Sequence, residues 1–165
     1  MKPTELIDLL RTFYQEKASM RIRHVAGARH VVDYNFNNTY QYIINREDLQ
    51  LNWVRDAITE LGGIVPDDPA EPQIHARGAA AEAQSAVVRE DRDGAQAFVD
   101  TWRPRVEQVT NARNKNMLRV ILGETLEAKR FFDQMVGGRE DLLGRRPDGA
   151  GTPGAVLPER WVGPS

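Results

Sequence analysis

The most constraining feature of this sequence is a long helical pattern whose apolar stripe is interrupted by polar residues. From residue 40 to residue 61, apolar side chains recur at the spacing of one face of an α-helix. Glu47 and Gln50 interrupt that stripe, where core residues would be expected. Gly62 and Gly63 follow, as is typical of a helix end. Because a buried charge needs a partner or a metal ion, Glu47 is the first indication of function.

Three further stretches show the same helical period. They cover about residues 4–27, 80–103 and 117–136. Thr4 is a good N-cap for the first of these, and Gly137 marks the end of the last. The sequence therefore predicts an all-α fold with four helices.

The connections between these stretches predict how the helices are arranged. Residues 28–38 are rich in asparagine and indicate the turn of an antiparallel helix pair. Residues 63–78 contain three prolines and no helical period, so we expect a long crossover there. We predict an antiparallel four-helix bundle with one long crossover between helices 2 and 3.

The length of 165 residues suits one domain of ordinary size. We expect residues 1–143 to form the bundle. From Gly144 onwards the chain is rich in glycine and proline and has no period. Residues 144–165 are therefore expected to be a C-terminal tail, either flexible or docked on the bundle or on a protein partner.

Composition excludes several classes of function. The 22 basic and 24 acidic residues are interspersed and give a net charge of −2, so we expect no nucleic-acid partner. The absence of cysteine excludes disulfides, thiolate metal ligands and thiol nucleophiles. No apolar stretch approaches the length of a membrane span, and the amino terminus does not resemble a signal peptide. We expect a cytoplasmic protein with no membrane partner.

Acidic residues also interrupt the apolar faces of the first and last helices. Glu16 lies on such a face in the first helix, and Glu124 lies on one in the last, with Glu127 about one turn away. The midpoint between Glu16 and Glu47 falls within residues 28–38. In a hairpin of two helices, these carboxylates should meet at one level.

The acid of the third helix follows from geometry. The separation found in the first hairpin, counted back from Glu124, points to about residue 93. Glu90 fits the helix face best, and Asp91 and Asp93 lie beside it. Glu107 is the alternative inward acid if the turn between the third and fourth helices comes later in the chain.

Inward acids have two explanations. They can bind metal ions, because iron and manganese take carboxylate ligands and a pair of metals needs bridging carboxylates. They can instead pair with basic side chains in a polar layer. The basic residues near enough for that are Lys17, Arg46, Arg119 and Arg130.

The order of the elements and their motifs resembles a known family. Glu16 is followed by Glu47-x-x-Gln50, Trp53 and the sequence AITELGG, and the last helix carries Glu124-x-x-Glu127. This order resembles the ferritin-like superfamily, particularly its rubrerythrin-like bacterial members, over about residues 4–138. The resemblance implies a ferritin-like bundle with a dinuclear iron or manganese site that reacts with dioxygen or peroxide, as an oxidase or ferroxidase does.

The resemblance also implies a ligand set. Its members would be Glu16, Glu47, Gln50, Glu90, Glu124 and Glu127. In the family each hairpin commonly carries Glu and then Glu-x-x-His, whereas Gln50 and Glu127 stand here at the histidine positions. The site would then be rich in carboxylates, or would have lost its metal.

The alternative is a metal-free helical bundle. It would act as a dimerising or partner-binding module, and a homo-oligomer is expected. His24 is interpreted as a cation near the C-terminus of the first helix.

Overall fold

The computed structural model describes residues 1–74, 78–139 and 142. This part of the chain consists of four long helices joined by connections, without a strand. Their bounds are α1 (Pro3–Ala28), α2 (Tyr34–Glu60), α3 (Ala80–Glu107) and α4 (Ala112–Val136). The prediction of an all-α fold with four helices is confirmed. The tail predicted for residues 144–165 lies outside the described residues.

The two ends of α2 follow from a side-chain cap and a glycine. The carboxylate of Asp33 accepts a hydrogen bond from the backbone N–H of Phe36 and starts α2. The predicted turn over residues 28–38 is therefore too long, because the helix already begins at Tyr34. At the other end Gly62 adopts a φ of 83°, which stops α2 as expected.

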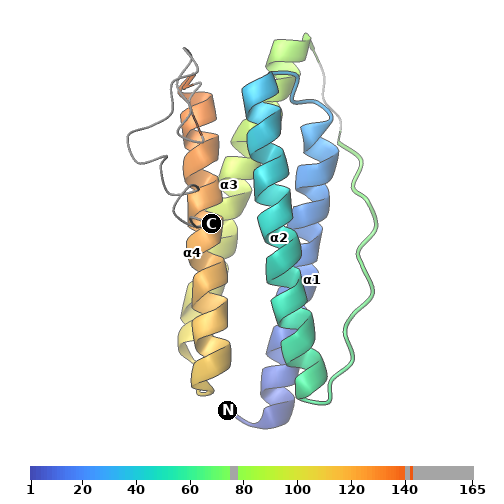
Figure 1. The fold of residues 1–165 in the computed structure, drawn as a ribbon, viewed down its shortest axis with the longest axis vertical. Coiled ribbons are helices and arrows are strands. Elements are labelled where there is room, and N and C mark those ends of the chain that lie inside the picture. Colours follow the sequence, from blue (N-terminus) through green and yellow to red (C-terminus); the bar gives the residue numbers. More distant parts are fainter. Residues whose placement is uncertain (75–77, 140–141, 143–165) are drawn as a thin grey trace, which may run out of the picture.

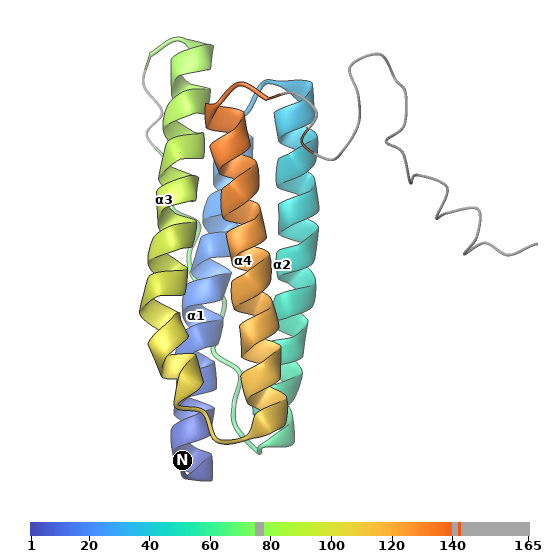
Figure 2. The ribbon, with the colours of Figure 1, turned by 90° about the vertical axis from the view of Figure 1, so that its left-hand side faces the viewer.

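The hairpin of α1 and α2 stands beside the hairpin of α3 and α4 (Figure 1), with α2 against α4 and α1 against α3. Within the first hairpin, Tyr14 contacts Arg55, and Arg21, further along α1, contacts the earlier residue Asp48. The two helices therefore run in opposite directions. Figures 1 and 2 show the same relation between α3 and α4.

The connection between α2 and α3 runs along the length of the bundle in Figure 1. It returns the chain to the end of the bundle at which α2 began, so α2 and α3 run in the same direction. Its described residues lie along α1: Asp68 accepts a hydrogen bond from the hydroxyl of Tyr14 at 3.3 Å, and Glu71 pairs with Arg29 at 2.6 Å.

The core consists of two apolar clusters, with a polar layer between them. The first includes Phe13 and Trp102, whose rings meet edge to face at 4.9 Å. The second includes Tyr40 and Phe132, with ring centres 5.3 Å apart. Each such fully buried side chain contributes roughly 2 kcal/mol through the hydrophobic effect. The layer between the clusters contains the charged groups described next.

None of the helices in the described part of the chain is long and apolar enough to span a membrane.

Candidate functional site

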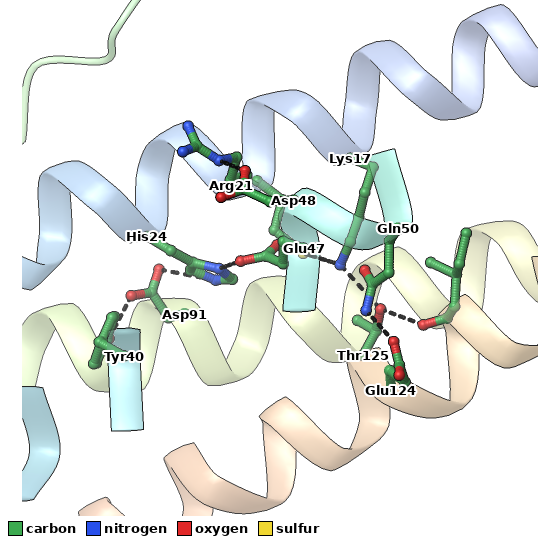
Figure 3. A network of polar contacts seen from close by, with 12 residues as sticks. Lys17, Arg21, His24, Tyr40, Glu47, Asp48, Gln50, Asp91, Glu124 and Thr125 are labelled. Carbon is green, nitrogen blue, oxygen red and sulfur yellow. Dashed lines mark hydrogen bonds and ion pairs between the residues drawn. The ribbon is translucent and has the colours of Figure 1, made fainter. Parts of the chain in front are cut away.

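The centre of the polar layer is the carboxylate of Glu47, which is only 2% exposed. Its Oε1 lies 2.5 Å from Nδ1 of His24, and its Oε2 lies 3.3 Å from Nζ of Lys17. The ammonium of Lys17 is equally buried and donates to the hydroxyl of Thr125 at 3.1 Å. Figure 3 shows these side chains converging from three helices. Both oxygens of Glu47 thus face a basic group.

The layer continues through His24 to the third helix. Nε2 of His24 lies 4.0 Å from Oδ1 of Asp91, and the hydroxyl of Tyr40 donates to Oδ2 of Asp91 at 2.5 Å. The ring of His24 packs against that of Phe132 at 5.5 Å. With Thr125 at its other end, the layer joins all four helices.

The helical repeat explains why α1 supplies two of these groups. Lys17 and His24 are seven residues apart, close to two helical turns, so they lie on one face. That face continues the buried row of Leu10 and Phe13. The stem of Lys17 passes over the apolar surface, and its Nζ lies 5.3 Å from the ring centre of Phe98.

Burial and neighbouring charges shift the pKa values of His24 and Glu47 in opposite directions. Burial alone would lower the pKa of His24, but the carboxylates of Glu47 and Asp91 outweigh it and raise the pKa above its ordinary value. Burial would raise the pKa of Glu47, but His24 and Lys17 outweigh it and lower the pKa. A protonated imidazole facing an ionised carboxylate is therefore the favoured state.

The pKa values of Asp91 and Tyr40 are raised mainly by burial. Burial raises the pKa of Asp91, and His24 and the hydrogen bond from Tyr40 offset only part of this rise. Burial, together with the charge of Asp91, raises the pKa of Tyr40 far above its usual range, so the phenol stays protonated and donates. In its fully ionised form the layer holds two cations, on Lys17 and His24, and two carboxylates, on Glu47 and Asp91.

A second polar group lies between α2 and α4, closer to solvent. Nε2 of Gln50 donates to Oε2 of Glu124 at 2.6 Å, and the guanidinium of Arg46 pairs with Oε1 of the same carboxylate. The hydroxyl of Tyr42 donates to Glu127 at 3.3 Å. Arg46 and Glu124 are 35% and 21% exposed, so this group borders the surface.

A cavity of about 20 Å³ separates the two polar groups. Oε2 of Glu47 and Oε1 of Gln50 are buried and accept no hydrogen bond from the described part of the protein. The contact of Lys17 with Glu47 is an ion pair without the alignment of a hydrogen bond. The residues around the cavity are Lys17, Met20, His24, Tyr42, Ile43, Arg46, Glu47, Gln50, Ala95, Glu124, Thr125, Glu127, Ala128 and Phe131.

The structure brings together four of the six residues predicted to bind metal. Glu47, Gln50, Glu124 and Glu127 line the cavity. Each of the three carboxylates already contacts a protein donor. Over residues 1–74, 78–139 and 142, no group of three or more acidic or histidine side chains is arranged to hold a metal ion.

The other two predicted ligands lie away from the cavity. Glu16 is exposed and accepts a hydrogen bond from the indole N–H of Trp102 at 2.5 Å. Glu90 is 63% exposed and pairs with Arg23 on the surface. The prediction that these two acids point inwards is wrong. Each next residue in the chain, Lys17 or Asp91, takes the buried position, because successive side chains point about 100° apart around a helix.

The ion-pair interpretation is confirmed for two acids, since Lys17 pairs with Glu47 and Arg46 pairs with Glu124. His24 lies near the C-terminus of α1, and its raised pKa agrees with its interpretation as a cation, but its burial in the layer was not predicted. The spacing of Lys17 and His24 along the apolar face of α1 was the signal that could have identified both.

Comparisons of the chain with protein-family models, with curated proteins and with solved structures find no match.

Proposed function

We propose that this chain is a metal-free helical bundle of ferritin-like topology that acts as a dimerising module. The position of Lys17 is the observation that supports a metal-free bundle. Its buried ammonium lies 3.3 Å from Oε2 of Glu47 and 3.1 Å from the hydroxyl of Thr125. A cation of the protein itself thereby neutralises the carboxylate, which is what a metal ion would otherwise do.

The donors around Glu47 fit a metal site poorly. One of its oxygens is held by His24 at 2.5 Å, and the other faces Lys17. A metal ion at Glu47 would have to approach the ammonium of Lys17 closely. Like charges about 4 Å apart repel by roughly 4 kcal/mol at an effective dielectric constant of about 20.

The ferritin-like topology is supported by the course of the chain. Two helix hairpins are joined by a connection that runs along the bundle from one end towards the other (Figure 1). Ferritin-like bundles share this arrangement of hairpins with one long crossover.

The face formed by α2 and α4 is the surface we propose for dimerisation. In the described part of the chain, no large apolar side chain of α1 or α3 is exposed. On α2 and α4, by contrast, Tyr42, Leu49 and Val120 are exposed. Val120 also lines a surface groove between these helices together with Trp53 and Met117. Apolar and aromatic side chains gathered on one face mark an interaction site.

The charges of this face suit a second copy of the same chain. In a two-fold dimer the same patch faces itself, so an unpaired charge near the axis would meet its own copy. Here Arg46 pairs with Glu124, and Arg113 pairs with Glu60 at 2.9 Å, within the face of one chain. Two copies can therefore meet without bringing unpaired like charges together at these positions.

The full chain tests this proposal by light scattering coupled to size-exclusion chromatography. We expect a mass of twice 18.6 kDa for the wild type. Leu49→Glu, in the middle of the face, should give the monomer mass. The matched control Val32→Glu introduces the same charge at an exposed apolar residue outside the face and should leave the dimer intact. A monomeric wild type, or equal effects of both variants, would refute the dimer.

A second candidate function is the dinuclear iron or manganese site, which is favoured by the gathering of Glu47, Gln50, Glu124 and Glu127 around one cavity. Metal analysis after expression with added iron and manganese separates the two candidates. About two metal ions per chain, lost in Glu47→Ala, would establish the metal site and overturn the metal-free proposal. We expect metal at background level.

A further inference from the structure

Two buried oxygens belong to residues that line the cavity between the polar groups, and neither accepts an aligned hydrogen bond from the described part of the protein. They are Oε2 of Glu47 and Oε1 of Gln50, and both side chains are 2% exposed. An unsatisfied polar atom in such a place costs about 1–3 kcal/mol. A molecule that donates to both oxygens would therefore be bound favourably.

The orientation of the Gln50 amide is fixed by its neighbour. Its nitrogen donates to Oε2 of Glu124 at 2.6 Å, so the amide oxygen must point the other way. A reversed amide would place its oxygen against the carboxylate of Glu124. The cavity therefore keeps an acceptor at Gln50, and the bound molecule must be a donor.

The size of the cavity limits the molecule to a single small one. A volume of about 20 Å³ is room for one water molecule. The apolar walls formed by Ile43, Ala128 and Phe131 leave no space for a larger hydrated ion.

The charge of the surroundings selects a neutral molecule. The ammonium of Lys17 lies 3.3 Å from Oε2 of Glu47, and the guanidinium of Arg46 lies at the outer side of the cavity on Glu124. Three cationic groups, of Lys17, His24 and Arg46, and three carboxylates, of Glu47, Glu124 and Glu127, line the cavity, so a further cation such as ammonium or sodium would leave an unbalanced charge. We propose that the cavity binds one neutral, water-sized molecule that donates a hydrogen bond to Glu47 and another to Gln50, namely water.

The bound water would connect two polar groups that, among the described residues, share no hydrogen bond or ion pair. On one side lies the buried layer of Lys17, Glu47 and His24, and on the other lies the group of Gln50 and Glu124 that borders the surface (Figure 3). A water molecule hydrogen-bonded to two buried acceptors exchanges more slowly than water on the surface, which makes it countable.

Oxygen-17 relaxation dispersion in water enriched in that isotope counts such slowly exchanging molecules in the full-length protein. We expect Gln50→Met, which removes the acceptor, to lower the count by about one. Ala128→Val, which leaves every polar group in place and fills the cavity, should lower it by the same amount. Gln41→Met, the same exchange at an exposed position of α2, should leave the count unchanged.

Several results would overturn the proposal. These are a wild-type count of zero, or no loss in either cavity variant, or an equal loss in Gln41→Met. A cation in the cavity would be revealed if ammonium chloride, but not sodium chloride, lowered the wild-type count, and this would also overturn the neutral assignment. Circular dichroism identifies a variant that does not fold. In that case the water count of the other cavity variant tests the proposal.

Discussion

Replacing Lys17 by methionine is the most direct perturbation of the polar layer. Methionine keeps an unbranched apolar stem against Phe98 but removes the ammonium that lies 3.3 Å from Glu47. It also removes the donor to the hydroxyl of Thr125. Glu47 is then left buried with His24 as its remaining cationic partner.

The expected cost follows from the charge and the distance. Two unit charges 3.3 Å apart attract by about 5 kcal/mol at an effective dielectric constant of about 20. Part of this is offset, because methionine avoids the cost of burying the ammonium. We therefore expect Lys17→Met to lower the free energy of unfolding by about 3 kcal/mol, within the range for breaking a buried ion pair.

Urea unfolding at neutral pH measures this in a double-mutant cycle with Glu47→Gln. The glutamine keeps an oxygen for His24 and removes the charge that Lys17 neutralises. The double variant should be less destabilised than the sum of the two single variants by more than about 1 kcal/mol. Lys129→Met is the control, because Lys129 pairs with Asp133 near the surface at 3.0 Å and such a pair contributes only about 0.5 kcal/mol.

The reasoning would be refuted by either of two results. One is a free energy of unfolding for Lys17→Met within about 0.5 kcal/mol of that of the control. The other is additivity of the two single variants within about 0.5 kcal/mol, since independent sites behave in that way.

Two further predictions concern His24 and Gly27. The folded-state pKa of His24 is raised above 6.5, so its stabilisation is complete below that value and is lost as the pH rises through the folded-state pKa. The free energy of unfolding should therefore fall as the pH rises from about 6.5 through the raised folded-state pKa, and His24→Gln should flatten this fall in urea titrations. Gly27→Ala should lower the melting temperature, because its Cβ would lie 2.9 Å from Val87 of α3 and overpacking costs about 1–3 kcal/mol. Gly94→Ala meets open space within a helix and should raise the melting temperature, so the same sign for both alanine variants would contradict this packing.

The sequence predicted the four helices because the apolar period of each one continues over many turns, although polar residues interrupt it. It located the end of α2 because Gly62 and Gly63 follow the last apolar residues. It placed the start of α2 too late, because the cap of Asp33 lies before a polar, asparagine-rich first turn that carries little apolar signal.

The site was predicted less well because helix faces are broad. Glu47 and Gln50 were placed inwards correctly, since α2 has a regular stripe around them. In α1 and α3 a shift of one residue exchanged the buried Lys17 and Asp91 for the exposed Glu16 and Glu90. Lysine, glutamate and aspartate are all seldom fully buried, so residue type could not decide which neighbour points inwards.

The polar layer also determines how the helices align along their axes. The apolar faces alone would tolerate a slide of one helix by a turn, about 5.4 Å, because leucine, valine and phenylalanine contacts are not directional. Such a slide would separate Glu47 from Lys17 and Asp91 from Tyr40, leaving buried charges and hydroxyls without partners. The polar contacts of the layer can therefore all form in only one axial register of the four helices.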